Sequence, residues 1–165
     1  MDIYTIDVEK ELEVLRTKST LVTNIDQELV NYTNQMLKSI EGIGIGLAAP
    51  QVGRNERFFV CQVDQMKPLV FINPEIIGTS EELSSYEEGC LSIPGMYGDV
   101  KRPAVIQIQA WNQKGRPFKM EAEGLLATCI QHELDHLNGL LFIDYLSDRK
   151  REKLLKKYKK SVEDQ

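Results

Sequence analysis

The sequence predicts an α+β fold, with antiparallel β-sheets packed around a central helix and further helices near the N- and C-termini. Three observations favour this class. Segments with strand-like patterns dominate the middle of the chain, helical periodicity appears near its two ends, and strands and helices do not alternate regularly. Regular alternation would indicate a parallel sheet, whereas this separation is typical of antiparallel sheets.

Length and composition favour one domain spanning residues 1–165, because 42% apolar residues are enough for a core. The first residues lack the basic start and apolar run of a signal peptide, and no apolar run is long enough to span a membrane. Three cysteines, an odd number, fit a reducing compartment. We therefore expect a cytoplasmic protein without a membrane segment.

The net charge of −5 is unevenly distributed. Residues 148–165 contain eight Lys/Arg and four Asp/Glu, a net +4, which leaves twelve Lys/Arg and 21 Asp/Glu, a net −9, for residues 1–147. The acidic body argues against DNA or general nucleic-acid binding. The basic tail is the one segment on which a polyanion could dock.

Two helices are expected before residue 42. The first is short and covers residues 9–17. The second is amphipathic and runs through Glu41, with Asn24 as its expected N-cap and Gln27 three residues later.

A glycine-rich stretch, residues 42–53, follows. Gly44, Gly46 and Ala49 match a dinucleotide-binding pattern, but the stretch follows a helix instead of a strand, and Pro50 would interrupt the helix it should open. Glycines let a partner approach the main chain closely, so Gly44 and Gly46 could pair with an extended peptide, and Gln51 offers a neutral amide donor. A glycine-rich connection without any ligand is the alternative.

Four segments are predicted to be strands, and the last two form an antiparallel hairpin around a turn at residues 112–115. They are residues 57–63, 68–73 (with 74–77 as a possible extension), 104–111 and 118–123. Cys61 is expected to be a core residue. The acidic residues 81–89 lead into Cys90 without an assigned element.

The hairpin leads directly into the central helix, which contains the only two histidines, His132 and His136, with Glu133 between them. Residues four apart lie one turn apart on the same helix face, so the two imidazoles can bind one metal ion, and the glutamate can act as base for a metal-bound water. The apolar flanks predict a buried helix, which argues against the alternative of two surface histidines. Gly139 is expected to end this helix in the left-handed conformation.

A catalytic site of this kind needs a third protein ligand. Phe142 stands where the extended three-histidine motif would place a histidine, and Asp144 could equally be a cap or a surface residue. Cys129 lies roughly 7 Å along the helix axis from the expected metal position, so Cys129 and Leu125 fit better as walls of an adjoining apolar pocket. Cys90 is the best candidate, and a buried core cysteine is the alternative.

Three stretches, residues 44–51, 88–92 and 131–136, resemble in order the three motifs of the peptide deformylases, and the resemblance extends from the helix before Gly42 through Tyr145. It implies hydrolysis of the N-formyl group from the formyl-methionine of new polypeptides. It also implies that the metal ligands are Cys90, His132 and His136, that Glu133 is the general base and acid, and that Gln51 and the backbone N–H of Leu91 face the developing oxyanion. The family's preferred ion is Fe(II), replaceable by zinc, nickel or cobalt.

The chemistry of these residues agrees with the resemblance. A metal lowers the pKa of bound water, so that hydroxide can attack the formyl carbon near neutral pH. Glu133 would take the proton and deliver it to the leaving amine. We expect the methionine side chain to enter a pocket formed by Ile45, Tyr86, Leu125, Thr128 and Cys129, with Gly46 and Gly89 pairing with the peptide backbone.

Two features qualify the resemblance. Tyr97 stands where some family members have a basic residue, and the basic tail resembles a C-terminal helix that docks on the ribosome in bacterial members. A solvated helix covering the core is the alternative for the tail. Two other functions compete: a metallopeptidase that cleaves internal peptide bonds, and a non-catalytic peptide-binding module.

Overall fold

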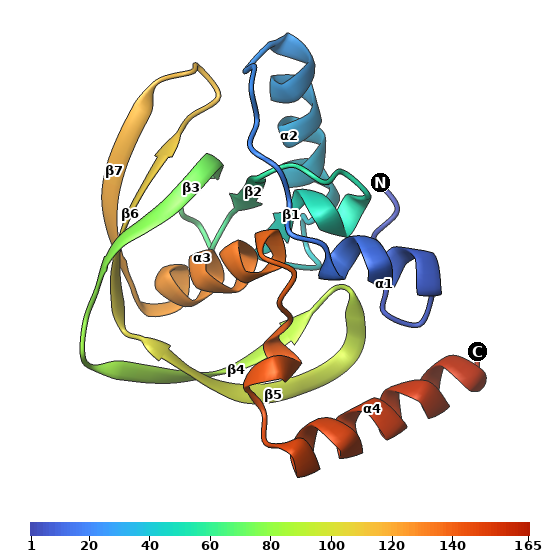
Figure 1. Ribbon diagram of the computed structural model, residues 1–165. Coiled ribbons are helices and arrows are strands. Elements are labelled where there is room, and N and C mark those ends of the chain that lie inside the picture. Colours follow the sequence, from blue (N-terminus) through green and yellow to red (C-terminus); the bar gives the residue numbers. More distant parts are fainter.

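The computed structural model describes residues 1–165, and its elements follow the expected order of helices, strands and helices (Figure 1). They are α1 (Glu9–Arg16), α2 (Gln27–Ser39), β1 (Gly46–Ala48), the 3-10 helix η1 (Ala49–Val52), β2 (Phe58–Cys61), β3 (Leu69–Thr79), β4 (Leu83–Cys90), β5 (Ile93–Pro103), β6 (Val105–Trp111), β7 (Pro117–Glu123), α3 (Gly124–Leu137), the 3-10 helix η2 (Phe142–Tyr145) and α4 (Asp148–Glu163). The predicted α+β class is confirmed. None of the helices combines the length and the apolar character that crossing a membrane requires.

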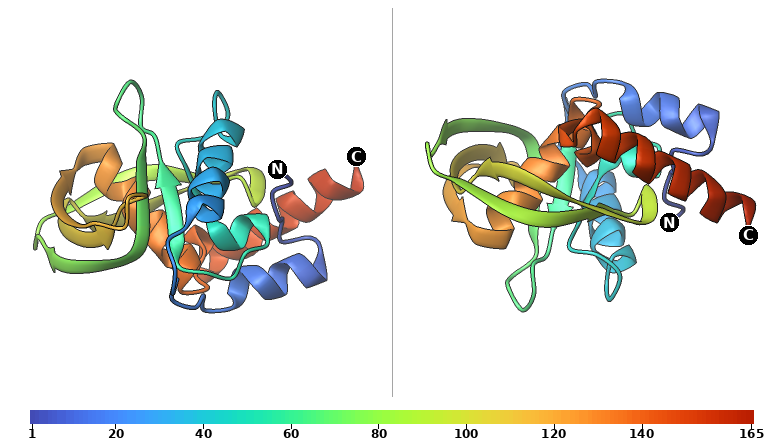
Figure 2. Two further views of the ribbon diagram at one scale, coloured as in Figure 1. Left: turned by 90° about the horizontal axis from the view of Figure 1, so that it is seen from above. Right: turned by 90° about the horizontal axis from the view of Figure 1, so that it is seen from below.

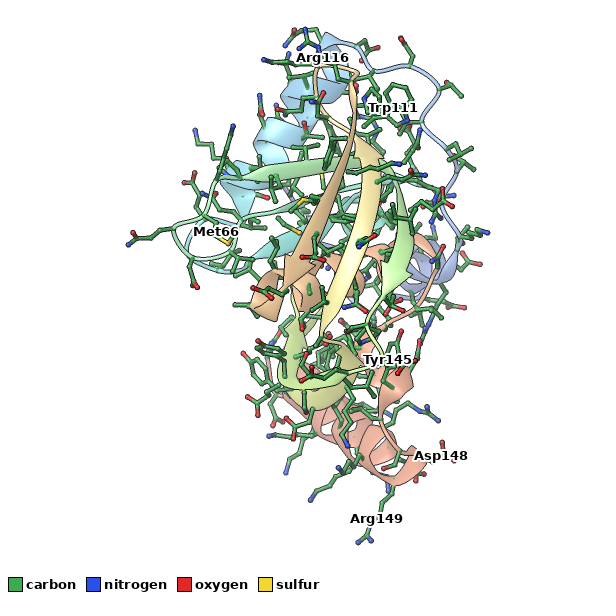
Figure 3. All side chains as sticks on the ribbon, turned by 90° about the vertical axis from the view of Figure 1, so that its left-hand side faces the viewer. Met66, Trp111, Arg116, Tyr145, Asp148 and Arg149 are labelled. Carbon is green, nitrogen blue, oxygen red and sulfur yellow. The ribbon has the colours of Figure 1, made fainter.

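Five strands form one antiparallel sheet in the order β1-β2-β3-β6-β7. The register between β3 and β6 shifts between Ile72 and Glu75 and again between Ile76 and Gly78. Such irregularities bend a strand and increase its twist. The sheet accordingly curves around α3 (Figure 1), and Figure 3 shows the outer side of its long strands.

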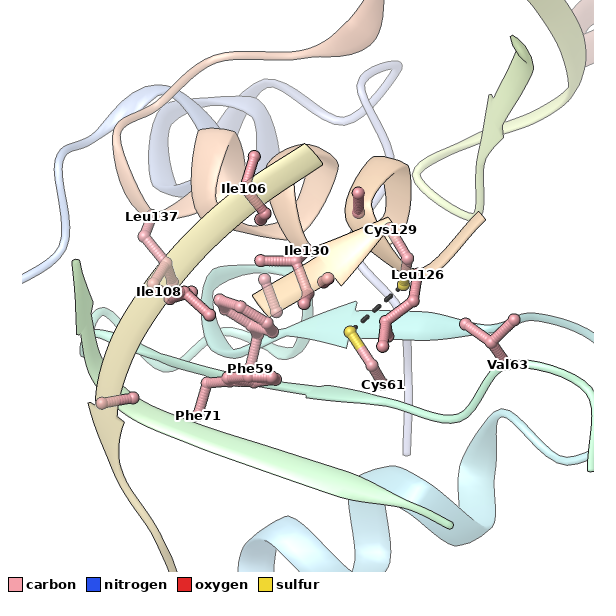
Figure 4. Packing of buried hydrophobic residues seen from close by; sticks show 14 residues of the cluster. Phe59, Cys61, Val63, Phe71, Ile106, Ile108, Leu126, Cys129, Ile130 and Leu137 are labelled. Atoms are coloured by element: carbon pink, nitrogen blue, oxygen red, sulfur yellow. Dashed lines mark hydrogen bonds between the residues drawn. The ribbon is translucent and has the colours of Figure 1, made fainter. Parts of the chain in front are cut away.

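The concave side of this sheet packs on α3 and encloses the largest apolar cluster (Figure 4). Phe59 and Phe71 stack in it with ring centroids 4.8 Å apart, and Ile130 and Leu137 of α3 are fully buried against the strands. Cys61 is also fully buried, which confirms that it is a core residue. The cluster therefore holds the helix that carries both histidines at the centre of the molecule.

The hairpin of β4 and β5 forms a separate two-stranded sheet that was not predicted. Its register runs from Leu83 opposite Pro103 to Gly89 opposite Tyr97, and it then shifts before Cys90, which pairs with Ile93. The apolar side chains of β5 face η2 and α4 in a third cluster. The shift places Cys90 at the end of the hairpin, against α3.

Helix α2 begins later than expected, because Asp26 and not Asn24 is its N-cap. The Asp26 carboxylate accepts a hydrogen bond from the Leu29 N–H at 2.9 Å, which is the capping geometry, while the Asn24 amide donates to the same carboxylate at 3.3 Å. The helix also ends at Ser39 instead of Glu41. An aspartate two residues further along thus takes the role assigned to Asn24.

The C-terminal part begins at Gly139, whose φ of +76° confirms the predicted left-handed helix end. A Cβ there would lie 2.4 Å from the Arg16 carbonyl oxygen, so glycine is also needed for close packing. Ser147 caps α4, which buries Leu154 and Tyr158 and otherwise presents mostly charged side chains. Figure 2 shows α4 extending along the hairpin towards the side where the N-terminus lies.

Candidate active site

Helix α3 presents His132, Glu133 and His136 on its inner side. His136 and Glu133 are only 1% and 3% exposed, and the two imidazole centroids lie 5.1 Å apart. The helical spacing of four residues produces this arrangement, as expected from the sequence. Phe142 of η2 stacks on the His132 ring at a centroid distance of 6.3 Å and limits its movement.

Cys90 joins the two histidines from the end of β4. Its Sγ lies 3.4 Å from His136 Nε2, and one donor atom from each of Cys90, His132 and His136 lies within 4.8 Å of the others. The cluster could therefore hold one metal ion, and one thiolate with two imidazoles suits zinc or iron. Cys129 and Asp144 are not part of it; Asp144 pairs with Arg16 instead.

The free oxygen of Glu133 also fits a bound metal. Its Oε2 is buried without a hydrogen-bond partner, beside the proposed ligands. A buried polar atom without a partner is costly, and a water held next to the ion would supply one. Burial raises the pKa of Glu133 to about 7, against the opposing effect of His132. The carboxyl group can thus both accept and release a proton near neutral pH.

A buried network that the sequence did not predict orients His132. The Nδ1 of His132 lies 2.9 Å from Glu88 Oε1, and Arg102 donates to the two oxygens of Glu88 at 2.7 and 3.0 Å. Arg102 also donates to Asp135 at 2.8 Å, and Tyr145 donates to the same Asp135 oxygen at 2.7 Å. Since Nδ1 is engaged with a carboxylate, Nε2 of His132 is left for the ion.

Glu88 stays ionised in this network. Burial alone would raise the pKa of its carboxyl group, but the hydrogen bonds from His132 and Arg102 hold that pKa below its usual value. The sequence position of Glu88, two residues before Cys90, could have indicated that Glu88 lies beside the metal-ligand cluster, since residues two apart share a strand face. Nothing in the sequence linked either residue to Arg102.

Burial acts in the opposite direction on His136. It lowers the pKa of this imidazole well below the usual value, and the positive charge of Arg102 lowers it further. The ring is therefore neutral, which is the form that binds metals.

Gln51, in η1, reaches the cluster from the glycine-rich stretch. Its side chain is 1% exposed; Oε1 accepts from the Ala48 N–H at 3.0 Å, while Nε2 donates to Ser92 Oγ at 3.1 Å and lies 3.6 Å from Cys90 Sγ. These contacts fix which end of the amide faces the thiol. Leu91 follows Cys90 in the turn before β5, and its side chain packs on Gly44.

A cavity of about 360 Å³ opens beside the cluster. It is lined by all of the residues predicted to contact substrate, together with Gln51, Cys90, Leu91, His132 and Glu133. The predicted substrate contacts are Ile45, Gly46, Tyr86, Gly89, Leu125, Thr128 and Cys129. Tyr97 also lines it, with 62% of its surface exposed.

Two glycines bring backbone close to this cavity. A Cβ at Gly46 would lie 2.8 Å from Cys129 Sγ and 3.0 Å from Glu133 Cγ, and a Cβ at Gly89 would lie 2.6 Å from the Tyr97 ring. Any larger residue would therefore displace its neighbours. Gly46 also belongs to β1, which pairs only with β2 and so has a free edge.

Comparisons with known proteins agree with the site. The family model described as polypeptide deformylase matches residues 2–152. Proteins named peptide deformylase from Rhizobium meliloti and Borreliella burgdorferi are 48% identical over 154 residues and 50% identical over 149 residues. The first alignment covers 90% of this chain and 88% of the relative, the second 88% and 90%.

Solved structures are similar over nearly the whole chain. A peptide deformylase from Synechococcus elongatus in complex with actinonin has a TM-score of 0.88 at 44% identity and covers 95% of this chain and 86% of its own. One from Ehrlichia chaffeensis, also in complex with actinonin, has a TM-score of 0.90 at 36% identity, with 98% and 96% covered.

Together with these similarities, the buried carboxylate and the cluster that could hold a metal ion identify the class of protein as a hydrolase. The chain belongs to the polypeptide deformylase family. The family assignment made from the three motifs is therefore confirmed.

Proposed function

We propose that this chain, acting as one catalytic domain over residues 1–165 in the cytoplasm, removes the N-formyl group from the formyl-methionine of newly made polypeptides. The observation that carries the proposal is the convergence of Cys90, His132 and His136 next to the partnerless carboxylate oxygen of Glu133, at the edge of one cavity. The family membership supports the same reaction.

Cys90, His132 and His136 would hold one divalent ion, with Fe(II) as our expected native metal and zinc, nickel or cobalt as substitutes. When bound, the ion would lower the pKa of water and polarise the formyl carbonyl. The Glu88–Arg102 pair keeps the Nδ1 side of His132 occupied and its ring in place.

Glu133 would move the proton. Its carboxylate takes a proton from the attacking water as the new carbon–oxygen bond forms at the formyl carbon, and it then delivers that proton to the leaving nitrogen as the carbon–nitrogen bond breaks. Formate and a free amino group result. A pKa of about 7 suits both steps, since neither protonation state is strongly favoured near neutral pH.

Gln51 and Leu91 would stabilise the charge that develops on the formyl oxygen. The Gln51 amide is held by Ala48 and Ser92 with its NH₂ group towards the thiol of Cys90, so it needs little rearrangement when charge appears. The backbone N–H of Leu91 would be the second donor.

The peptide would pair with the backbone of Gly46 and Gly89, where a side chain has no room. Its methionine would enter the part of the cavity lined by Ile45, Tyr86, Leu125, Thr128 and Cys129. This lining is mostly apolar, which suits an unbranched thioether side chain.

The replacement Glu133→Gln tests the reaction. We expect kcat for a formyl-Met peptide to fall by about 100- to 10,000-fold, because the proton acceptor is lost, while the protein keeps its metal. Formate release, metal content and folding are measured side by side. An unformylated peptide serves as the control substrate, and cleavage of its internal bonds by the wild type, without formate release from the formyl-Met peptide, would contradict the proposal.

The replacement Leu125→Arg tests the methionine pocket. A charged side chain in this lining should strongly reduce kcat/KM for formyl-Met peptides, since burial of an unpaired charge is costly. Leu140→Arg is the matched control, because Leu140 is 40% exposed and does not line the cavity. A near-normal kcat/KM for Leu125→Arg would show that Leu125 does not contact the methionine side chain of the substrate.

A further inference from the structure

Two cysteines outside the metal-ligand cluster lie in contact with each other. Cys61 ends β2 and Cys129 lies in the second turn of α3, and their Sγ atoms are 3.1 Å apart (Figure 4). Both are free thiols. A disulfide needs a sulfur–sulfur distance of about 2.05 Å, so the two atoms must approach by only about 1 Å.

The two thiols differ in access. Cys61 is fully buried among apolar side chains that include Phe59 and Phe71, and burial raises its pKa well above the usual value, with Cys129 raising it further. Cys129, in contrast, lines the active-site cavity. A small oxidant that enters the cavity therefore reaches Cys129 before Cys61, and the sulfenic acid that forms on Cys129 already contacts a second thiol.

We propose that Cys61 and Cys129 are a site of reversible disulfide formation, driven by a hydroperoxide that enters the cavity. With hydrogen peroxide, the Cys129 sulfur attacks one peroxide oxygen, the O–O bond breaks, and Cys129 becomes a sulfenic acid with release of water. The Cys61 sulfur then displaces the hydroxyl group from the Cys129 sulfur, and this group leaves with the Cys61 proton as a second water. The two thiols are oxidised to one disulfide, and the peroxide is reduced.

The disulfide would alter the methionine pocket. The Cys129 sulfur lies against Gly46, where a Cβ would approach it to 2.8 Å, and it lies 3.6 Å from the Ile45 carbonyl oxygen. Bond formation moves this sulfur towards Cys61 by up to about 1 Å and so changes its contacts with Gly46 and Ile45. This consequence depends on the proposed function. A displacement of this size changes the shape of the apolar pocket by about one methylene group, which predicts a KM for formyl-Met peptides about tenfold higher. The disulfide itself does not depend on that function.

Mass spectrometry after cleavage at glutamate tests the site, because such cleavage puts each cysteine on its own peptide: residues 57–75, 89–121 and 124–133. The full-length protein is loaded with zinc, which is not redox-active, treated with hydrogen peroxide, alkylated under denaturing conditions and digested. We expect a link between peptides 57–75 and 124–133 that dithiothreitol reverses, with the 89–121 peptide still alkylated. A sulfinic acid at Cys129, or oxidation at Cys90 alone, would overturn the proposal.

The variants Cys61→Ala and Cys61→Ser separate this chemistry from other oxidation, since Cys61 is a core residue outside the substrate contacts. Whichever variant folds should show wild-type kinetics before treatment, no linked peptide, and no dithiothreitol-reversible rise in KM. An equal reversible rise in the variant would overturn the proposal. If the wild type releases no formate at all, the proposed reaction fails, but the linked peptide still decides whether the disulfide forms.

Discussion

At the scale of single residues, the site depends on side chains whose orientation is fixed by hydrogen bonds to neighbours both near and far in the sequence. Gln51 is the clearest case, because its carbonyl oxygen and its NH₂ group each have a fixed partner, Ala48 and Ser92. A buried amide held at both ends cannot turn over without losing a hydrogen bond. The donor facing Cys90 is therefore ready before substrate arrives.

The replacement Gln51→Leu tests this donor. It removes the amide with little change in volume, so we expect kcat to fall by about 100- to 1,000-fold while KM changes little, as for the loss of one oxyanion donor. Ser92→Ala is the matched control; it loosens the amide without removing it and should cost less. Steady-state kinetics with a formyl-Met peptide decide, and a normal kcat for Gln51→Leu would exclude an oxyanion role.

Residue patterns predicted part of the site. His132, Glu133 and His136 follow from helical spacing, and Cys90 from the need for a third ligand together with the family motifs. Arg102 could not be predicted, because it reaches Glu88 only through the β4–β5 register, in which Arg102 lies opposite Ser84. Its contacts with Glu88 and Asp135 cross from one element to another and have no local sequence signal.

At the scale of elements, the β4–β5 hairpin explains why the strand prediction was incomplete. Its residues are rich in serine, glutamate, glycine and proline, which have low strand propensity, and most of β4 is exposed or half-buried. Backbone pairing and packing of β5 on η2 and α4 stabilise it instead. Such tertiary stabilisation outweighs local propensity and is not visible in a window of sequence.

The connection between α1 and η2 makes a prediction about pH. Arg16 donates to both oxygens of Asp144 at 2.7 and 3.0 Å, and the Leu141 N–H donates to the same carboxylate. Partial burial alone would raise the pKa of Asp144, but these donors hold it below the usual value. A lowered folded-state pKa gives stability that is present above the unfolded pKa, about 3.9, and is lost as pH falls through the folded value.

We therefore expect Asp144→Asn to lower the free energy of unfolding by about 1 kcal/mol at neutral pH and by progressively less below about pH 4. Urea unfolding of the wild type and of Asp144→Asn across this pH range measures the difference in their free energies of unfolding. The contributions of the other carboxyl groups are the same in both proteins and cancel. Asp148→Asn is the control, since Asp148 is 96% exposed and pairs only with Arg151. A gap that stays constant with pH would show that the charge of Asp144 does not contribute.

At the scale of the whole molecule, the curved five-stranded sheet and the separate hairpin enclose α3 from two sides (Figure 1). The cavity lies where β1, the end of β4 and α3 meet, so the proposed ligands and donors come from three separate parts of the chain: η1, the end of β4 with the turn that follows it, and α3. The sequence predicted most of the strands and the class of fold. It could not predict the strand order β1-β2-β3-β6-β7, since that order depends on pairings between segments far apart.

Helix α4 carries the excess positive charge of residues 148–165, and we propose that it docks on the ribosome. Leu154 and Tyr158 are buried, and Tyr158 donates to Asp7, so deletion of residues 149–165 would also expose part of the core. The cations Lys156, Lys157 and Lys160 are exposed, and Arg149 points away from the protein (Figure 3). Charge reversal therefore tests docking more cleanly than truncation.

The triple replacement of Lys156, Lys157 and Lys160 by glutamate changes the net charge of residues 148–165 from +4 to −2. We expect co-sedimentation with ribosomes to be lost, because attraction to the polyanion becomes repulsion, while stability changes by less than about 0.5 kcal/mol per surface position. Hydrolysis of a free formyl-Met peptide should be unchanged. The matched control reverses three exposed cations of the β6–β7 hairpin, Lys114, Arg116 and Lys119. Arg116 lies at the opposite end of the molecule from Asp148 and Arg149 of α4 (Figure 3). If both triple variants co-sediment as the wild type does, α4 only covers the core; if both are lost equally, the attraction is a property of the total charge and not of α4.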